Sequence, residues 1–207
     1  MQSAAIKIRF IGNCGLHMTD GNLDVYVDFP YKSGAYGYMR YAVSELDSIA
    51  EDAVFVFTHK HKDHFSGKIM RRVLREKHGE KFTPWKTAGL EKHARALPNF
   101  DIEVLKTKHS FSLRHRSYLI TWHGKKIYLS GDTEHAEAIG EAGGIDWAFV
   151  PYWLLLDAQE KGIEVDATKI GIYHIAPAQV PSAKEKWGNR EKIHPFTTQG
   201  EIIEIEI

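Results

Sequence analysis

The sequence predicts an α/β fold in which chemically reactive side chains gather where strands end. Residues 54–57 form a continuous apolar run typical of a buried strand, and a helical spacing of apolar residues follows over 66–78. Between them lies a short turn with three histidines and one aspartate. Because open α/β sheets leave a ligand crevice at the carboxyl ends of their strands, we expect a functional site at this turn.

The remaining elements follow from the same patterns. Apolar alternation and β-rich runs predict strands at 5–11, 23–28, 101–108, 117–122, 125–130, 146–152, 169–173 and 200–207. Helical spacing predicts helices at 44–50, 87–96, 134–141 and parts of 154–165. A chain of 207 residues without a linker or repeat is expected to form one domain over 1–207.

Composition narrows the possible roles. Lysine plus arginine and aspartate plus glutamate number 27 each, so the formal net charge is zero. This balance argues against a large nonspecific nucleic-acid surface, although it is compatible with a local basic patch. The single cysteine, Cys14, excludes an intrachain disulfide and favours a reducing compartment. The sequence shows neither a leader-like segment nor a membrane-length apolar run, so we expect a cytoplasmic protein with no membrane partner.

The turn after the buried strand, residues 58–64, carries His59, His61, Asp63 and His64. Neutral imidazole and carboxylate are ligands for zinc and other divalent first-row ions. On an extended turn His59 and His61 can point to one side while Asp63 and His64 turn toward a neighbouring position, so that one turn serves two ions. The alternative is a solvated loop kept soluble by its lysines, which explains a lone histidine better than four ligands in six residues.

Residues 58–64 resemble the Thr-His-x-His-x-Asp-His signature of the metallo-β-lactamase superfamily. Later segments resemble the family's remaining motifs in the same order: a strand ending at His109, a hairpin followed by Gly-Asp-Thr at 131–133, and a strand ending at His174. The similarity covers nearly the whole chain, and it extends to the compact metal-dependent hydrolases that include ascorbate-6-phosphate lactonase. It implies an αββα sandwich of two mixed β-sheets flanked by helices, with metals at one edge.

The resemblance also implies a binuclear metallohydrolase. One ion would be held by His59, His61 and His109, and the other by Asp63, His64 and His174, with Asp132 bridging the two. The ions would be divalent, most simply zinc, with manganese or iron as alternatives. A metal-bridged hydroxide would cleave a small-molecule ester, lactone or phosphodiester, with Asp63 and Asp132 as catalytic residues. Asp28 ends a strand where family members carry an aspartate that orients a ligating imidazole, although an aspartate there is also ordinary turn chemistry.

Two of these ligands have competing interpretations. Asp132 precedes a helical pattern, where an aspartate is a common helix N-cap. His174 lacks the proline and methionine that often precede the family's last histidine, and His194 is its rival. The histidines at 78, 93 and 123 fall in helical patterns or at a hairpin turn, and we expect none of them to be a ligand.

The aromatic, glycine-containing loop 29–41 is a candidate wall or lid for substrate. Tyr31, Lys32 and Arg40 are its predicted substrate contacts, with either cation meeting an anion. A cover over the core edge or a dimer contact explains the loop equally well. His115, just after a predicted ligand, is a further candidate to face substrate.

Three other functions stay open. An RNA-processing nuclease uses similar ligands but needs an RNA-gripping exosite, which the sequence does not reveal. A di-iron oxidoreductase shares the fold, but that branch replaces the second histidine of the turn with glutamate, and the chain has His61 there. A noncatalytic domain is disfavoured because every expected ligand is present. We therefore expect a small-molecule substrate rather than nucleic acid, and we leave a homo-oligomer open.

Overall fold

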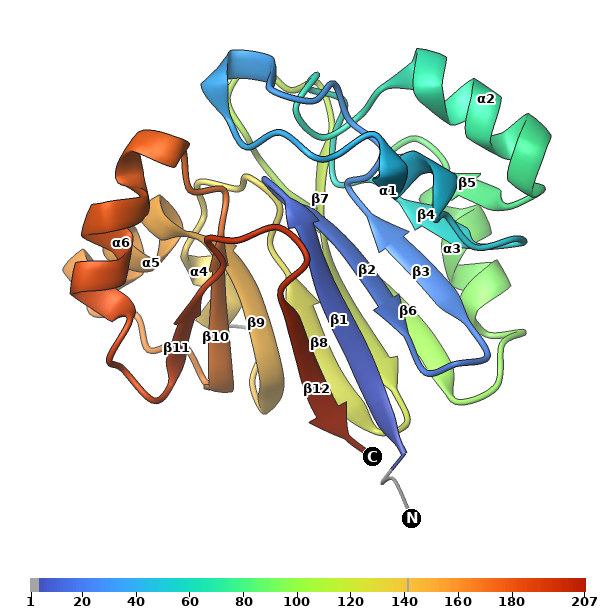
Figure 1. The fold of residues 1–207 in the computed structure, drawn as a ribbon. Helices are drawn as coiled ribbons and strands as arrows, with labels where there is room; N and C mark the ends of the chain where they lie inside the picture. Colours follow the sequence, from blue (N-terminus) through green and yellow to red (C-terminus); the bar gives the residue numbers. More distant parts are fainter. Residues whose placement is uncertain (1–3, 141) are drawn as a thin grey trace.

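Two six-stranded β-sheets pack face to face, with helices on the outer side of each (Figure 1). The computed structural model describes residues 4–140 and 142–207. The strand order is β12-β1-β2-β3-β4-β5 in the first sheet and β11-β10-β9-β8-β7-β6 in the second. This arrangement confirms the expected αββα sandwich of two mixed sheets.

The first sheet is antiparallel on one side and parallel on the other. Strands β12, β1, β2 and β3 pair antiparallel, whereas β3, β4 and β5 run parallel. Because β3 and β4 end at the same edge, Asp28 lies beside the turn that begins at Thr58. The strands are β1 (Ala5–Gly12), β2 (Gly15–Thr19), β3 (Asp24–Val27), β4 (Val54–Val56), β5 (Glu80–Phe82) and β12 (Ile202–Glu206).

The second sheet mirrors this division. Strands β6, β7 and β8 pair antiparallel, and β8, β9, β10 and β11 run parallel. The shared direction of β8 and β10 brings Asp132 and His174, which follow them, to one edge. The strands are β6 (Phe100–Thr107), β7 (His115–Trp122), β8 (Lys125–Leu129), β9 (Ile145–Pro151), β10 (Ala167–Tyr173) and β11 (Ile193–Pro195).

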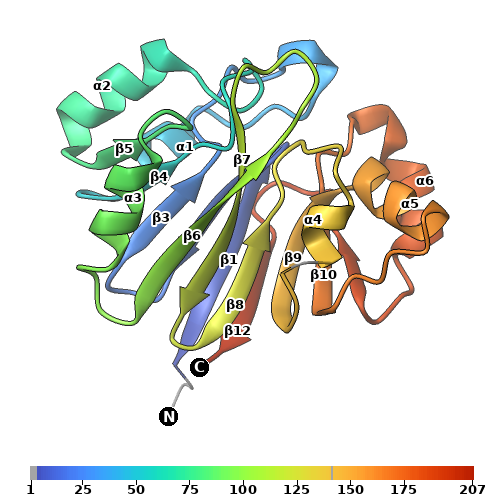
Figure 2. The ribbon, with the colours of Figure 1, turned by 180° about the vertical axis from the view of Figure 1, so that it is seen from behind.

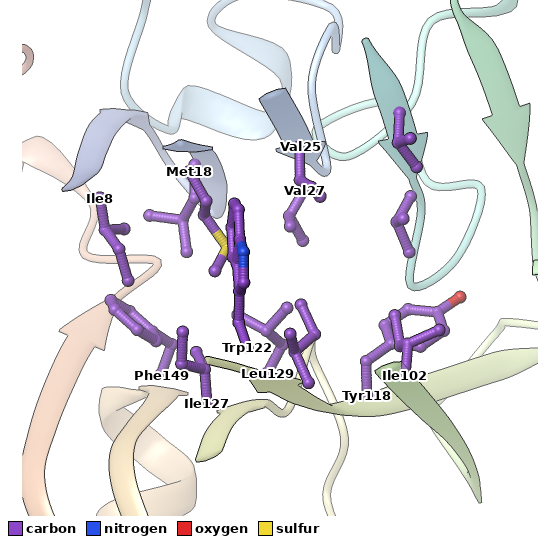
Figure 3. Packing of buried hydrophobic residues seen from close by; sticks show 14 of the residues in the cluster. Ile8, Met18, Val25, Val27, Ile102, Tyr118, Trp122, Ile127, Leu129 and Phe149 are labelled. Atoms are coloured by element: carbon purple, nitrogen blue, oxygen red, sulfur yellow. The ribbon is translucent and has the colours of Figure 1, made fainter. Parts of the chain in front are cut away.

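The main core fills the space between the sheets. Ile8, Met18 and Val25 of the first sheet face Trp122 and Leu129 of the second, and all five are fully buried (Figure 3). Burial of each of the aliphatic and methionine side chains stabilises the folded state by about 1.5–3 kcal/mol. This core fixes the two sheets against each other and thereby fixes the edge at which their loops meet.

The helices cover the outer faces, as Figures 1 and 2 show from opposite sides. Helices α1 and α2 lie on the first sheet, where Met70 and Val73 pack with Phe55 and Phe57. Helices α4, α5 and α6 lie on the second sheet, and α3 packs against β5 and β6. The bounds are α1 (Ser44–Asp47), α2 (Gly67–Lys77), α3 (Thr87–Ala94), α4 (Glu137–Gly140), α5 (Tyr152–Glu160) and α6 (Val180–Trp187), with 3-10 turns η1 (Ala35–Gly37) and η2 (Pro177–Gln179).

All the strands and helices expected from the sequence occur, and four further elements do as well. Strands β2, β5 and β11 and helix α6 were not expected. Helix α4 is shorter than expected, since it begins at Glu137 rather than at 134; Glu141, its expected end, lies outside the described residues. Within the described residues, no helix is both long and apolar enough to cross a membrane.

Candidate metal centre

Six of the seven predicted ligands, all except Asp63, meet together with Cys14 at one edge of the sandwich, at the opposite end from the two chain termini (Figure 1). They form two groups, in each of which the ligand atoms lie within 4.8 Å of one another. One group consists of His59, His61 and His109; the other consists of Cys14, His64, Asp132 and His174. Five separate chain segments supply these side chains, so the site forms only when the two sheets pack together.

Asp132 lies between the two groups. Its Oδ2 atom is 3.0 Å from His64 Nε2 and 3.0 Å from His174 Nε2 in the second group. The same oxygen is 3.9 Å from His59 Nε2 and 4.0 Å from His109 Nε2 in the first group. A single carboxylate oxygen therefore faces both groups, as the bridging role requires.

The turn 58–64 supplies side chains to both groups. His61 Nδ1 lies 3.3 Å from His109 Nε2, which closes the first group. Asp63 Oδ2 is 3.5 Å from His64 Nε2 and 3.2 Å from His174 Nε2, so this carboxylate adjoins the second group. The structure thus brings His59 and His61 to one group and His64 to the other, with Asp63 beside the second.

A cleft of about 380 Å³ opens over these groups. It is lined by Tyr36, Tyr38, His61, Asp63, His109, Asp132, Glu134, Trp153 and His174. The rings of Tyr38 and Trp153 meet the His174 ring edge to face, with centroids 4.0 and 4.8 Å away. Aromatic side chains from loop 29–41 and from α5 thus form the wall of the cleft.

Asp28 holds the turn 58–64 from behind. Its Oδ2 atom accepts a hydrogen bond from Thr58 Oγ1 at 2.7 Å and lies 2.9 Å from His64 Nδ1. Its Oδ1 atom accepts the Thr58 backbone N–H at 2.8 Å. Thr58 Oγ1 in turn lies 3.0 Å from His59 Nδ1. One carboxylate therefore orients two imidazoles so that their Nε2 atoms face the site.

Two neighbours fix the position of Asp132. The Asp132 backbone N–H donates to His115 Nε2 at 3.0 Å, so His115 Nδ1 carries the proton that it shares with Thr107 Oγ1 at 2.7 Å. Gly131 has φ +58°, and a Cβ there would lie 2.7 Å from both His115 Nε2 and Thr58 Cβ. Only glycine fits this close approach without displacing the strand end that carries Asp132.

Comparison with solved structures identifies the architecture. Igni18, a metallo hydrolase from Ignicoccus hospitalis, is 16% identical with a TM-score of 0.68 over 98% of this chain and 99% of its own. YhfI, a metallo-β-lactamase fold protein from Bacillus subtilis, is 13% identical with a TM-score of 0.65 over 97% of this chain and 100% of its own. This chain has the metallo-β-lactamase fold. No family model and no curated protein matches its sequence.

The metallo-β-lactamase fold also occurs in a protein of different chemistry. CmlA, a diiron β-hydroxylase from Streptomyces venezuelae, is 10% identical with a TM-score of 0.59. The match covers all of this chain and 55% of CmlA. The fold alone therefore does not distinguish hydrolysis from oxidation.

The donor set fits metal ions. His59 Nε2 is buried, faces the other candidate ligands and has no hydrogen-bond partner among the described residues. An unsatisfied buried nitrogen is costly, and a cation at its lone pair would remove the cost. Burial and the neighbouring His64 hold the pKa of His59 well below its usual value, so this imidazole is neutral, as a ligand must be.

Carboxylates in and beside the second group favour a positive charge on its imidazoles. Burial acts to lower the pKa of His64, but the carboxylates of Asp132 and Asp28 raise it well above its usual value. Burial acts to raise the pKa of Asp132, but His174 and His64 hold it well below its usual value. Asp132 is therefore ionised, and the protons held on its partners are those that a bound cation would displace.

Some residues at this metallo-β-lactamase-fold site were not predicted from the sequence. Cys14 is fully buried, and its Sγ lies 3.7 Å from Asp132 Oδ1. Asn13 Nδ2 donates to the Asp63 backbone oxygen at 3.0 Å, and Asn13 O accepts the His174 N–H at 3.0 Å. The Gly-Asn-Cys-Gly sequence at 12–15 could have indicated these two residues. It forms a glycine-flanked turn at the end of β1, and that strand end lies at the same edge as the candidate ligands.

The predicted substrate contacts need correction. Tyr31 is fully buried and donates to Met39 O, because Tyr31 packs against other aromatic rings of its loop. His115 is 1% exposed and lies behind Asp132, so it supports the site rather than facing the cleft. Lys32 and Arg40 are exposed, but neither lines the cleft.

The rival ligand His194 lies elsewhere. It belongs to β11, and its Nε2 atom is 2.7 Å from Glu201 Oε1. His174, at the end of β10, is the histidine that the structure places against Asp132. Its ligand role stays a prediction, but the geometry brings only His174 of the two to the site.

Proposed function

We propose that this chain is a binuclear metal-dependent hydrolase that cleaves an ester, lactone or phosphodiester bond. The observation that carries the proposal is the position of Asp132 Oδ2, which faces histidine nitrogens of both ligand groups at 3.0–4.0 Å. One ion would be held by His59, His61 and His109; the other would be held by Asp63, His64 and His174, with Asp132 shared and Cys14 beside the second position. We take zinc as the simplest occupant of this nitrogen-rich set.

When bound, two divalent cations would supply a water of lowered pKa as nucleophile and would polarise the substrate oxygen under attack. Asp63 lines the cleft, and the imidazole of His174 outweighs the effect of burial and holds the Asp63 pKa below its usual value. Its carboxylate is therefore ionised near neutral pH and can accept the proton of the attacking water. Tyr38 and Trp153 restrict solvent access beside His174 and present apolar surface to the substrate.

A di-iron oxidoreductase is the second candidate, and the shared fold of CmlA is the observation that favours it. The hydrolase and the oxidoreductase differ in the metal that they need and in the reaction that they catalyse. A hydrolase should work with redox-inert zinc, whereas an oxygen-dependent enzyme needs iron and consumes dioxygen.

The test is an activity screen of the purified chain loaded separately with zinc, manganese and iron. Model phosphodiesters, lactones, esters and thioesters are offered with and without chelator, and oxygen uptake is recorded in parallel. We expect hydrolysis of one substrate class with at least one metal and none after chelation. Turnover that survives complete metal removal, or oxygen consumption without any hydrolysis, would contradict the proposal.

A further inference from the structure

A basic groove lies outside the metal cleft, between α2 and the segments beside it. Its volume is about 820 Å³. Apolar side chains of Leu46, Phe65 and Ile69 contribute to its lining, and no carboxylate lines it. Six cations do: Lys32, Lys62, Lys68, Arg71, Arg72 and Arg75. In a chain whose net charge is zero, this is a pronounced local concentration of one sign.

The helical cations form a row. Positions 68, 71, 72 and 75 fall on one face of α2, because residues three and four apart are neighbours on a helix. At about 1.5 Å per residue the row is about 10 Å long, which is more than one phosphate group spans. Arg72 and Arg75 approach Glu76 at 3.5 and 3.9 Å, whereas Arg71 makes no ion pair with any described residue.

The row continues toward the metal centre. Phe65 lines the groove, and the Nζ atoms of Lys60 and Lys81 each lie 6.0 Å from the centre of its ring. Lys60 Nζ is also 4.2 Å from the ring centre of Trp85, which is 43% exposed. Arg114 Cζ lies 5.8 Å from the same ring, and Arg114 follows His109 in the loop between β6 and β7.

These cations repel one another. Burial and the nearby Lys86, Lys60 and Arg71 hold the pKa of Lys81 below its usual value. Like charges held together destabilise the fold unless a counter-charge is supplied, and within the described residues Lys60, Lys81 and Arg114 form no ion pair. A polyanion bound along this surface would relieve the repulsion.

We infer that this basic groove, together with the Lys60–Trp85–Arg114 cluster, binds single-stranded nucleic acid. Phosphates would lie along the row of cations, and bases would stack on the exposed ring of Trp85. Such combinations of a basic groove with aromatic platforms are how proteins hold single strands without reading their sequence. The inference goes beyond the proposed hydrolysis, because it concerns a surface outside the cleft and can be tested without turnover.

Two features favour this ligand over others. The length of the cation row exceeds a single phosphate, which argues against a small anion. The groove is a concave pocket lined by Phe65, and Lys60 connects it to the exposed ring of Trp85, whereas a membrane would need a flat basic face. The zero net charge of the chain is compatible with this basic groove, because acidic residues elsewhere in the chain balance its charge.

The experiment measures fluorescence anisotropy of a labelled 12-nucleotide oligodeoxythymidine with the full chain in excess chelator, so that metal and hydrolysis play no part. We expect binding at about 50 mM salt that weakens steeply with salt. At about −0.7 per phosphate contact on a single strand, six contacts predict a slope of about −4 in a plot of log affinity against log salt. Tripolyphosphate should compete weakly at equal phosphate concentration, and phosphatidylglycerol vesicles should not bind.

The variant is Arg71→Gln with Arg75→Gln, and its matched control is Lys184→Gln with Arg190→Gln on and beside α6. All four side chains are exposed, and Lys68→Gln with Arg72→Gln provides a second test pair if the first fails to fold. We expect each groove pair to weaken binding at least about tenfold and to reduce the slope by about 1.4, with the control unchanged. Absence of oligonucleotide binding, equal effects of groove and control pairs, tripolyphosphate competition as strong as that of the oligonucleotide, or vesicle binding would each overturn the inference.

Discussion

Asp132 has two competing interpretations, as the N-cap of a helix and as the carboxylate that bridges two metal ions. Helix α4 begins at Glu137, so Asp132 does not occupy the position of an N-cap. Its carboxylate instead points into the space between His64 and His174, and its backbone is held by His115. The structure therefore does not support the helix-cap interpretation of Asp132.

Asp132→Asn is the corresponding test. Asparagine keeps the shape but removes the negative charge between two cation positions, so the variant should fold, bind metal more weakly and lose at least about two orders of magnitude in kcat. Metal content and turnover are measured beside thermal melts with and without chelator. Wild-type turnover at full metal occupancy would show that the carboxylate does not bridge.

The two candidate last ligands can be separated by a pair of substitutions. His174→Ala should lose one metal ion and most activity, because His174 Nε2 faces Asp132 and Asp63. His194→Ala removes only the contact with Glu201 and should keep both ions and normal activity. Elemental analysis and turnover of both variants distinguish the two histidines. Loss of a metal ion and of activity in His194→Ala, but not in His174→Ala, would assign the ligand to His194.

At the scale of elements, the strand ends that carry the candidate ligands could be predicted, because these strands are strongly apolar and depend on local sequence. The strands β2 and β5 could not be predicted as easily. Glu80-Lys81-Phe82 has no strand pattern of its own and becomes β5 only by pairing with β4. Helix α6 carries Pro181 in its first turn, which obscures a helical pattern even though proline is tolerated there.

The lining of the cleft could not be predicted for a related reason. The aromatic loop 29–41 was expected to supply substrate contacts, and it does form the wall, but through Tyr36 and Tyr38 rather than Tyr31. Which ring of an irregular loop turns inward depends on packing between distant segments. Trp153 comes from α5, and its position beside His174 depends on how β9 and β10 pair.

Asp20 connects the turn between β2 and β3 with the hairpin turn of the other sheet. Its Oδ1 atom accepts the backbone N–H groups of Asn22 and Leu23 at 2.9 and 3.0 Å. Its Oδ2 atom accepts Trp122 Nε1–H at 3.3 Å and lies 2.7 Å from His123 Nε2. Burial acts to raise the Asp20 pKa, but these hydrogen bonds lower it below its usual value.

Asp20→Asn should therefore destabilise the protein in a pH-dependent way. A depressed pKa gives stability that is present above the unfolded pKa of about 3.9 and is lost as pH falls through the folded value. We expect a loss of about 1–2 kcal/mol in unfolding free energy at pH 7 and a smaller loss at about pH 3. Urea unfolding at both pH values measures it, with the exposed Asp101→Asn as control. A loss that is equal at both pH values would show that the charge of Asp20 is not what stabilises the turn.

At the scale of the whole molecule, the sandwich places the five segments that carry candidate ligands at one edge and leaves the termini at the other (Figure 1). No single segment holds a complete site. His59 and His61 need His109 from the other sheet, and His64 needs Asp132 and His174. Metal binding should therefore depend on the folded sandwich and should in turn stabilise it.

The central claim is that this edge holds two ions at once, with Asp132 shared between them. The most direct measurement is elemental analysis of the chain purified without chelator and then saturated with zinc, with protein concentration determined independently. Two complete ligand groups predict about two ions per chain. Reproducibly finding no more than one ion per chain after saturation would contradict the binuclear centre.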